Sequence, residues 1–541
     1  MKTKHAPALS LALALLLHLG MAQAAPADDI RALAASASST EHKDSPYDEH
    51  DWLERFYSKN AYAPAWKPAT ARAALALLKD APVNGLSSAD YNADGLATAL
   101  SGNGIAAATD VALTEAMLHY LADLKVGRVR SEYHTTLPDP RLSAFDPVEQ
   151  LRTALAQNKL AGAVDAAQPS VFLYKKVKVL LAHYRDLASQ PETPLPPLAD
   201  KTKVEEGKPY PHAAQLRQRL ALLGDLPADA APTPADVYAK PLADAVRTFQ
   251  ARNGLTDDGV LGRGTIASLN VPLRVRVRQL ELTLERLRWL PDFGAGPIIA
   301  VNLPTFRLWA FQLGMPDAPP PVEMRVIVGT AVKNQTPLFI GTMRYVEFNP
   351  YWNVPKSIEK AEIIPKLKAK PNYLVDNQME LVPLSGTGEP IQKVDAETMQ
   401  GLLDGKFRVR QRPGPSNALG AVKFAMPNPD NIYLHSTSAR ELFKKTRRDL
   451  SHGCIRVEKP VELAKFVLGN HATMTAEDIE AAMEPAPMRT VSVKPAIPVV
   501  LFYATAITDQ HGTALFAQDI YGRDPALEAA LAGRYPKPAK R

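Results

Sequence analysis

Ser451-His452-Gly453-Cys454-Ile455-Arg456 is the stretch from which both the fold and the chemistry of this 541-residue chain can be read. Cys454 is the single cysteine of the sequence, so an intramolecular disulfide is excluded. The chain begins like an exported protein, and a lone thiol in such a protein needs a chemical reason. We therefore interpret Cys454 as a nucleophile.

A nucleophilic cysteine needs a base, and His435 in Tyr433-Leu434-His435-Ser436 is the candidate. At an ordinary thiol pKa of ~8.5 only a small fraction is ionised at neutral pH. An imidazole can take the thiol proton and later return it to a leaving amine. Gly453 permits a sharp turn before the nucleophile, and we expect the amides of Gly453 and Cys454 to be free to stabilise an oxyanion.

Outward from this motif, short segments in which apolar and polar residues alternate predict a mainly β domain over residues 296–541. We expect strands at 298–301, 306–311, 323–328, 341–348, 421–426, 432–435 and 499–506, and a helix at 460–468. The hairpin of 421–426 and 432–435 would bring His435 to a strand end. Residues 349–409, rich in Lys and Pro, predict a capping insertion over the site, with a simple long loop as the alternative.

The N-terminal half of the chain is expected to be helical. Residues 25–199 are rich in Ala and Leu with helical periodicity, and the proline-rich segment 191–197 ends them as a linker. Residues 205–271 have the pattern of a compact three-helix module. The amphipathic stretch 273–291 carries several arginines, which we expect on a solvated helix face.

The first residues have the pattern of a signal peptide, which we place at residues 1–24. Lys2 and Lys4 precede an apolar run over 8–17, and Ala22-Gln23-Ala24 is a small-residue cleavage pattern. The expected location is therefore the periplasm, and membrane attachment follows only if the segment stays uncleaved. The net charge of +6 is mild, and no basic stripe interleaved with aromatics predicts a nucleic-acid partner.

Two sequence patterns resemble known bacterial cell-wall proteins. Residues 249–255, Phe-Gln-Ala-Arg-Asn-Gly-Leu, followed by Asp258-Gly259-Val260-Leu261-Gly262, are similar to a peptidoglycan-binding module, with a plain helical spacer as the alternative. His435, fifteen intervening residues and then Ser451-His452-Gly453-Cys454 resemble the signature of the L,D-transpeptidase family. Arg456 stands where that family often has Asn, and its larger, two-lobed periplasmic branch commonly shows Arg.

The resemblance to the L,D-transpeptidase family implies a multidomain α+β protein. It would consist of a helical scaffold domain, a three-helix peptidoglycan-binding module and a mainly β catalytic domain with a capping insertion. The family's roles carry over to Cys454 as nucleophile, His435 as general base and the Ser436 carbonyl as the group that orients the imidazole.

Four further residues are candidates for the site, each with a structural alternative. His452 either tunes the thiolate or packs beside the turn. Arg456 either binds a substrate carboxylate or forms a structural ion pair. Tyr351 and Trp352 either shape the substrate channel under the cap or serve as packing residues. A zinc site is disfavoured, because His435, His452 and Cys454 supply three ligands where structural zinc takes four.

The resemblance implies cross-linking of peptidoglycan between third-position diaminopimelate residues. Its partners would be stem peptides and glycan strands, carbapenem-type inhibitors would react with Cys454, and no cofactor is required. With water as acceptor the same site is an L,D-carboxypeptidase, and with a lysine amine it anchors a lipoprotein. A cysteine endopeptidase and a non-catalytic peptidoglycan-binding scaffold are the remaining alternatives.

Overall fold

The computed structural model describes residues 26–37, 46–133, 140–314, 322–370, 372–469, 474–509 and 511–534, and the predicted signal peptide lies outside them. The chain divides into two compact units. The first comprises residues 1–185, 277–292 and 523–541, and the second comprises residues 186–276 and 293–522. Among the helices within the described residues, none combines the length and the apolar run needed to cross a bilayer.

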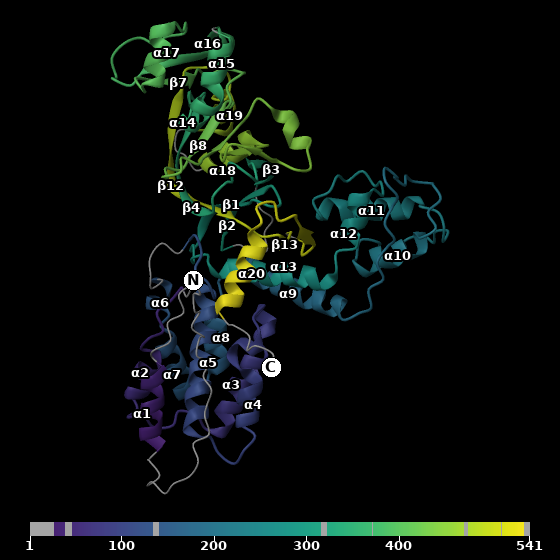
Figure 1. Ribbon diagram of the computed structural model, residues 1–541, viewed down its shortest axis with the longest axis vertical. Coiled ribbons are helices and arrows are strands. Elements are labelled where there is room, and N and C mark those ends of the chain that lie inside the picture. The colour runs from purple at the N-terminus through teal and green to yellow at the C-terminus, as the bar shows by residue number, and fades with distance from the viewer. Residues whose placement is uncertain are drawn as a thin grey trace, which may run out of the picture. The chain divides into compact units, whose positions relative to one another are not determined.

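The first unit is helical (Figure 1). Its elements are α1 (Pro26–Ala37), α2 (Trp52–Ser58), α3 (Pro68–Lys79), η1 (Ala81–Asn84), η2 (Ser88–Tyr91), α4 (Ala93–Ala99), α5 (Ala107–Val126), α6 (Pro140–Ala144), α7 (Pro147–Gln157), α8 (Leu160–Ala167), most of α9 (Phe172–Ala188), most of α13 (Leu273–Arg288) and α20 (Arg523–Arg534). Helix α5 is buried on all sides and packs against α1, α3, α7 and α8. A helix that is covered all round carries no polar face, which is why its sequence lacks a clear amphipathic period.

Two carboxylates lie inside this helical core, and each accepts hydrogen bonds. The Tyr57 hydroxyl donates to Asp110 at 2.7 Å. The hydroxyls of Tyr47 and Tyr91 donate to the two oxygens of Asp123 at 2.6 and 2.8 Å. Buried carboxylates are tolerated when their oxygens are satisfied in this way, so these acids are structural.

The arginines of the stretch 273–291 do not all lie on a solvated face, which corrects the expectation from its pattern. The Arg288 side chain is fully buried and donates to the Glu285 carboxylate at 2.8 Å, and Glu285 is itself fully buried. The Arg128 backbone amide donates to the other oxygen of Glu285 at 2.5 Å. The guanidinium groups of Arg128 and Arg288 both pair with Glu285, so the buried negative charge is compensated. Amphipathic periodicity cannot reveal such an arrangement.

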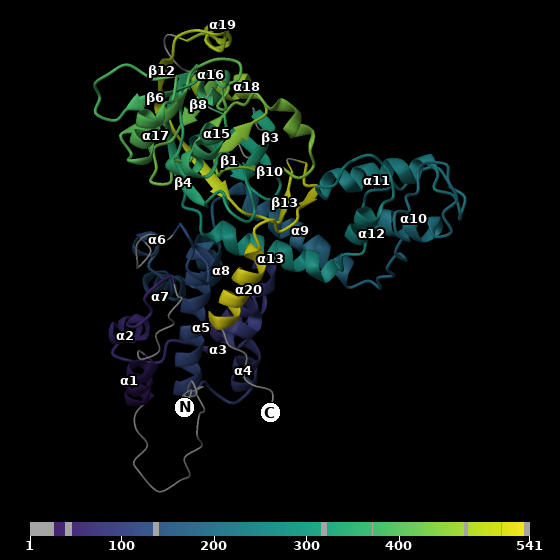
Figure 2. The same cartoon turned by 45° about the horizontal axis from the view of Figure 1, so that its top comes forward.

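The second unit begins with a three-helix module, visible at the right of Figure 2. Its helices are α10 (Ala213–Leu222), α11 (Lys240–Arg252) and α12 (Arg263–Leu269). The side-chain amide of Gln250 donates to the Val260 carbonyl at 3.1 Å, and its oxygen accepts from the Gly259 amide at 2.8 Å. Gly259 has φ +71°, so Gln250 fastens a turn that favours glycine.

The catalytic candidates lie on a closed β-barrel. The strands are β1 (Gly296–Asn302), β2 (Arg307–Leu313), β3 (Val322–Gly329), β4 (Phe339–Phe348), β8 (Val422–Ala425), β9 (Leu434–His435), β10 (Asp449–Ser451), β11 (Ile455–Val457) and β12 (Arg489–Phe502). Their order is β10-β3-β11-β9-β8-β4-β12-β1-β2, and β3 also pairs with β2. This extra pairing closes a ring of eight strands, which removes exposed edges.

The remaining elements complete the mainly β part, and the expected multidomain α+β fold class is confirmed. They are η4 (Arg440–Lys444), α18 (Pro460–Leu468), α19 (Ala476–Ala481), β13 (Ala506–Thr508) and β14 (Ala514–Phe516). The expected strands are present, although the one expected at 432–435 has only two residues and the one at 499–506 is the end of the longer β12.

The insertion is a folded element, hereafter the cap. It contains β5 (Trp352–Asn353), α14 (Lys356–Ile358), the π-helix η3 (Glu359–Ile363), α15 (Ile364–Ala369), α16 (Tyr373–Asp376), β6 (Met379–Pro383), α17 (Ala396–Leu403) and β7 (Phe407–Gln411). Strands β5, β7 and β6 form a separate sheet with β7 in the centre. One hydrophobic cluster, which includes Leu374, Leu381 and Val409, forms its core, so this segment is not a simple loop.

Candidate active site

Cys454 and His435 are positioned by two neighbouring strands of the barrel. Strand β11 pairs in parallel with β9, with Arg456 opposite His435. The Ile455 amide donates to the Tyr433 carbonyl at 3.1 Å, so Cys454 enters β11 beside Tyr433. Residues 433 and 435 lie on the same face of their strand because side chains alternate. The fold therefore brings both candidates to one end of the same strand pair.

His435 is buried, with 5% of its surface exposed. Its Nδ1 atom lies 2.5 Å from the Ser436 carbonyl oxygen, as the resemblance implied. Burial and the nearby charge of Arg456 lower the pKa of His435 to about 3, although the backbone of Ser436 and Leu419 opposes the shift. At neutral pH the ring is therefore uncharged, and the carbonyl holds the hydrogen on Nδ1. The Nε2 atom is left able to accept a proton.

The Cys454 thiol is partly buried and hydrogen-bonded. Its sulfur lies 3.6 Å from the Asn431 carbonyl oxygen, to which the thiol can donate. Desolvation raises the pKa of Cys454, while hydrogen bonds from Tyr433 and the positive charges of Lys423 and Arg456 act in the opposite direction. At neutral pH the resting group is therefore a thiol, which has to lose its proton before it can attack.

Tyr433 is a site residue that the sequence reasoning missed. Its hydroxyl hydrogen-bonds with Cys454, and its ring stands edge-on to His435 with 5.6 Å between the centroids. Lys423, which pairs with Glu347 at 2.9 Å, lies over the same ring at 4.9 Å. Alternation along β9 was the available signal, because residue 433 shares a face with residue 435.

The turn before the nucleophile is held by a hydrogen-bond network. Gly453 has φ +120°, a conformation that favours glycine, and its amide donates to Ser451 Oγ at 3.1 Å. Ser451 Oγ donates to the Cys454 carbonyl at 2.6 Å, and Thr336 Oγ1 donates to the Gly453 carbonyl at 2.7 Å. The Gly453 amide is thus engaged, which differs from our expectation. The Cys454 amide has no hydrogen-bond acceptor within the described residues.

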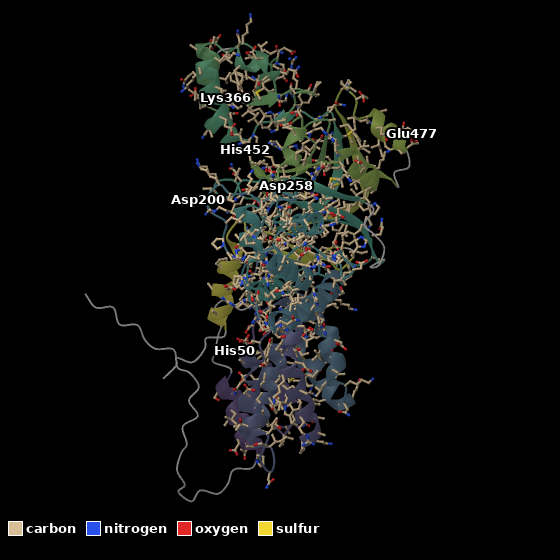
Figure 3. The ribbon with its side chains drawn as sticks, turned by 90° about the vertical axis from the view of Figure 1, so that its right-hand side faces the viewer. His50, Asp200, Asp258, Lys366, His452 and Glu477 are labelled. Atoms are coloured by element: carbon tan, nitrogen blue, oxygen red, sulfur yellow. The ribbon has the colours of Figure 1, made fainter. Side chains whose placement is uncertain are left out.

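His452 contacts the cap, whose Lys366 is labelled close to it in Figure 3. Its Nε2 atom lies 2.5 Å from a carboxylate oxygen of Glu362, whose other oxygen lies 3.5 Å from Lys366. The side chains of His452 and Glu362 are 44% and 38% exposed, so this is a surface ion pair when His452 is protonated. The contact favours a role in joining the motif to the cap over a direct role at the thiol.

Arg456 lies beside the site without an ion-pair partner. It stands opposite His435 on β11, and burial lowers its pKa. Its Nε atom is buried and has no hydrogen-bond partner among the described residues, which also contain no carboxylate within ion-pair distance of it. A guanidinium in this state can accept a bidentate carboxylate, whereas the structural ion pair that the sequence left open is not formed.

Tyr351 and Trp352 lie at the start of the cap and have different surroundings. The Trp352 side chain hydrogen-bonds with the Tyr433 hydroxyl, and an indole N–H can only donate. Tyr351 instead lies under the guanidinium of Arg410, 4.1 Å from its ring centre. Trp352 therefore connects the cap to the hydroxyl that contacts the nucleophile, and Tyr351 belongs to the cap sheet.

Three or more grouped His, Cys, Asp or Glu side chains, as a metal needs, do not occur in the described part of the chain.

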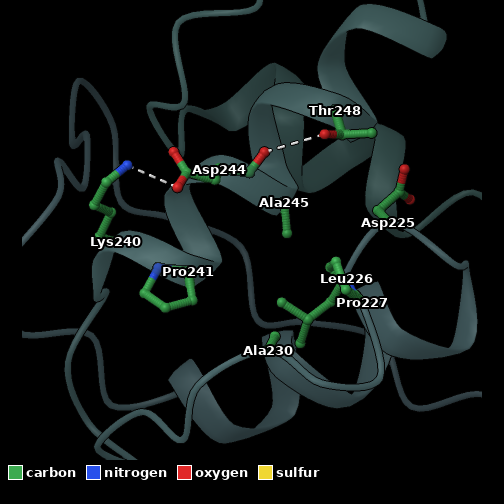
Figure 4. A pocket seen from close by; sticks show the side chains of 9 residues that line it. All are labelled: Asp225, Leu226, Pro227, Ala230, Lys240, Pro241, Asp244, Ala245 and Thr248. Carbon is green, nitrogen blue, oxygen red and sulfur yellow. Dashed lines mark hydrogen bonds and ion pairs between the residues drawn. The ribbon is translucent and has the colours of Figure 1, made fainter.

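A separate pocket lies in the three-helix module. It measures about 450 Å³ and is lined mostly by apolar groups, with Leu226, Pro227 and Pro241 at its wall (Figure 4). Lys240 and Asp244 stand at one side and form an ion pair of 2.8 Å. The pocket involves none of the residues near Cys454.

Three parts of the chain match models of known protein families. Residues 296–493 match the model of the L,D-transpeptidase catalytic domain, residues 51–181 match a scaffold domain, and residues 211–269 match a model described as "Putative peptidoglycan binding domain". A curated protein of Haemophilus influenzae, named "Putative L,D-transpeptidase", is 36% identical over 255 residues. That match spans 47% of this chain and 49% of the relative, about half the length of each.

Proposed function

The catalytic domain of this chain belongs to the L,D-transpeptidase family, and we propose that the protein cross-links peptidoglycan between third-position diaminopimelate residues. The observation that carries the proposal is the pairing of β9 with β11, which brings a neutral imidazole and a hydrogen-bonded thiol to adjacent strands. An attached peptidoglycan-binding domain supports peptidoglycan as the substrate.

In the first half-reaction Cys454 is acylated. His435 Nε2 takes the thiol proton as sulfur attacks the carbonyl of the third residue of a donor tetrapeptide stem. The bond between that carbonyl carbon and the terminal D-alanine nitrogen breaks, and the imidazolium returns the proton to the leaving amine. A thioester on Cys454 remains, and it conserves the energy of the acyl bond without a cofactor.

In the second half-reaction an amine of a neighbouring stem's diaminopimelate attacks the thioester. His435 removes a proton from the attacking amine, a new amide forms, and sulfur leaves as the thiolate before it is reprotonated. Cys454 is thus regenerated with atoms and charges balanced. The single base serves both half-reactions because its resting form is neutral.

The surrounding groups have supporting roles in this scheme. The Cys454 amide is the first candidate for the oxyanion donor, since the Gly453 amide already donates to Ser451. Tyr433 positions the sulfur through its hydroxyl, and Trp352 in turn positions that hydroxyl from the cap. Arg456 would hold a substrate carboxylate beside the imidazole, a geometry that guanidinium suits.

Two other acceptors use the same acyl-enzyme. Water would make the protein an L,D-carboxypeptidase, and a lysine amine would make it a lipoprotein-anchoring enzyme. A cysteine endopeptidase would consume cross-linked dimers instead of forming them, and a non-catalytic scaffold would bind the wall without reacting. We favour cross-linking because the thiol, the base and a wall-binding domain are combined in one chain.

We propose that the protein acts in the periplasm after export through a cleaved signal peptide. The residues that support this are Lys2, Lys4, the apolar run over 8–17 and the pattern at Ala22-Gln23-Ala24. Peptidoglycan, the expected substrate, also lies outside the cytoplasm. A role in cell-wall biogenesis and cell shape follows from this location and activity.

One experiment tests both the nucleophile and the acceptor. Purified protein and its Cys454→Ala variant are incubated with sacculi, and the muropeptides are analysed by mass spectrometry. We expect dimers linked between third-position residues with the wild type alone, while both proteins still bind sacculi. Trimmed monomers would indicate the carboxypeptidase, and loss of existing dimers would indicate the endopeptidase. A carbapenem should add its mass to the wild type, and a scaffold would not react.

A further inference from the structure

The cap sheet carries three arginines on one face. Arg408 and Arg410 lie in β7, and Arg412 follows directly while its amide continues the ladder by donating to the Gln378 carbonyl at 2.9 Å. Side chains at every second position of a strand share a face and are ~7 Å apart. Strand β7 is the central strand of its sheet, so this basic face does not border a free edge.

The opposite face of the same strand is the core of the cap. Val409 is fully buried and packs with Leu381 and Met379 from β6. The alternation therefore separates the apolar core from the arginine face. We call the set Arg408, Arg410 and Arg412 the arginine face.

Only one arginine of the arginine face forms an ion pair with a carboxylate of the described residues. Arg410 donates to Glu380 of β6 at 2.8 Å, and its guanidinium also covers the Tyr351 ring at 4.1 Å. Arg408 and Arg412 have no ion-pair partner within the described residues. Three guanidinium groups thus share one acid, and two positive charges remain uncompensated.

The side chains of the two arginines without an ion-pair partner, Arg408 and Arg412, are partly buried. The Nε atoms of Arg408 and Arg412 are buried without a hydrogen-bond partner among the described residues. A buried donor without an acceptor costs free energy. Both side chains are nevertheless partly exposed, so other N–H groups of the two guanidinium groups can meet a ligand. Since Arg guanidinium groups pair bidentately with carboxylates, the arginine face has the chemistry of a carboxylate site.

The arginine face is connected to the catalytic strands through the chain itself. Tyr351, which lies under Arg410, comes three residues after Phe348, the last residue of β4. Strand β4 pairs with β8, where Lys423 stands opposite His435. The start of the cap is therefore close along the sheet to the proposed base.

We propose that Arg408 and Arg412 form a binding site for the free carboxylates of a peptidoglycan stem peptide. The inference rests on the proposed function and adds a substrate site to it. A tetrapeptide stem has a free carboxylate on its diaminopimelate residue and another at its C-terminus. Arg408 and Arg412 are four positions apart, which is ~13 Å along a strand. One stem carboxylate stands at the end of the long diaminopimelate side chain and the other at the C-terminus, so each can pair with a different guanidinium group.

Binding without turnover gives the cleanest test. In Cys454→Ala protein, isothermal titration calorimetry measures the Kd of a soluble disaccharide-tetrapeptide muropeptide and of the same muropeptide with its carboxylates amidated. We expect Arg408→Gln and Arg412→Gln each to raise the Kd of the acidic muropeptide about tenfold. The matched control Lys393→Gln, which removes an exposed positive charge elsewhere on the cap, should leave it unchanged.

The outcomes separate this site from the proposed function. The amidated muropeptide should bind weakly and equally to all variants, and Arg408→Lys should recover part of the affinity. An unchanged Kd in both glutamine variants overturns the inference, as does an equal loss for the amidated ligand, which would indicate a structural role. Carbapenem acylation of the protein with Cys454 intact, expected within about twofold of wild type in both variants, reports separately on the nucleophile.

Discussion

The Nδ1 atom of His435 lies 2.5 Å from the carbonyl oxygen of Ser436, the next residue along the chain. The backbone, not a side chain, therefore sets the tautomer and the orientation of the imidazole. This arrangement predicts that Ser436→Ala retains carbapenem acylation within about twofold, whereas His435→Gln slows it by about 10²–10⁴. Intact-protein mass spectrometry over time measures both rates. Equal losses in the two variants would contradict the backbone role.

The pH dependence of acylation follows from the two pKa shifts. The pKa of His435 is lowered to about 3, so the ring stays neutral and able to accept a proton throughout the ordinary pH range. The pKa of Cys454 is raised, so its thiolate accumulates only in alkaline solution. We expect the carbapenem acylation rate to be nearly constant from about pH 5 to pH 8 and to increase above that. A steep acidic decline centred near pH 6.5 would contradict a buried, neutral base.

Tyr433→Phe tests the hydroxyl that contacts the nucleophile. Loss of this hydrogen bond should raise the thiol pKa and slow acylation by about 10- to 100-fold, because a hydrogen bond to a charged group contributes about 1.5–3 kcal/mol. Tyr345→Phe on β4 is the control, since its hydroxyl has no hydrogen-bond partner within the described residues. A structural role alone would lower the melting temperature without displacing the alkaline rise of the rate profile.

Gly453→Ala tests the strained turn. Gly453 has φ +120°, while the nearest atom to an added Cβ, Ile432 Cδ1, is 3.5 Å away. The cost is therefore backbone strain of about 1–3 kcal/mol and not a clash. We expect slower acylation because the turn carries Cys454. Gly264→Ala in α12 has open space and no positive φ, so it should be neutral or slightly stabilising. Wild-type acylation by Gly453→Ala would refute this role.

Glu285→Gln tests the buried cluster of the helical unit. It leaves Arg128 and Arg288 without their shared carboxylate and should reduce the free energy of unfolding by about 3–5 kcal/mol. Glu528→Gln, which breaks a pair with Arg278 whose side chains are 37% and 47% exposed, should cost at most about 1 kcal/mol. Denaturant unfolding followed by circular dichroism measures both. Similar small effects would mean that the cluster contributes little.

The same cluster predicts a pH dependence of stability. The pKa of Glu285 is lowered in the folded state by the two arginines, although burial opposes them. Its contribution is therefore fully present above the unfolded carboxyl pKa of about 4.3 and declines as the pH falls below it. The free energy of unfolding should therefore decrease less between pH 7 and pH 3 in Glu285→Gln than in the wild type, and denaturant unfolding at the two pH values measures this difference.

Local sequence patterns were sufficient to predict the strands of the catalytic domain and part of the candidate site. Alternating apolar residues located β1 to β4 within a few residues, because a half-buried strand repeats every two positions. Cys454 was singled out as the solitary thiol, and the resemblance of the whole motif to the L,D-transpeptidase signature supported His435 as its base. The carbonyl of Ser436 was also anticipated from the family resemblance.

Three features could be identified only from the tertiary structure. Tyr433 reads as an ordinary apolar strand residue, and only the pairing of β9 with β11 brings its hydroxyl to the sulfur. The amide of Gly453 could not be known to be engaged until Ser451 Oγ was placed beside it. Arg288 lies on an amphipathic helix, yet its side chain is fully buried and pairs with Glu285.

The sequence by itself determined the residue types, their order and their periodicity, and these predict the helical, module and β parts and the candidate nucleophile and base. Closure of the barrel, the contact of Glu362 with His452 and the unpaired charges of the arginine face were decided by tertiary structure alone. The physical reason is that pKa shifts and unsatisfied charges depend on which distant segments exclude water from a group, and the spacing of residues along a chain does not contain that information.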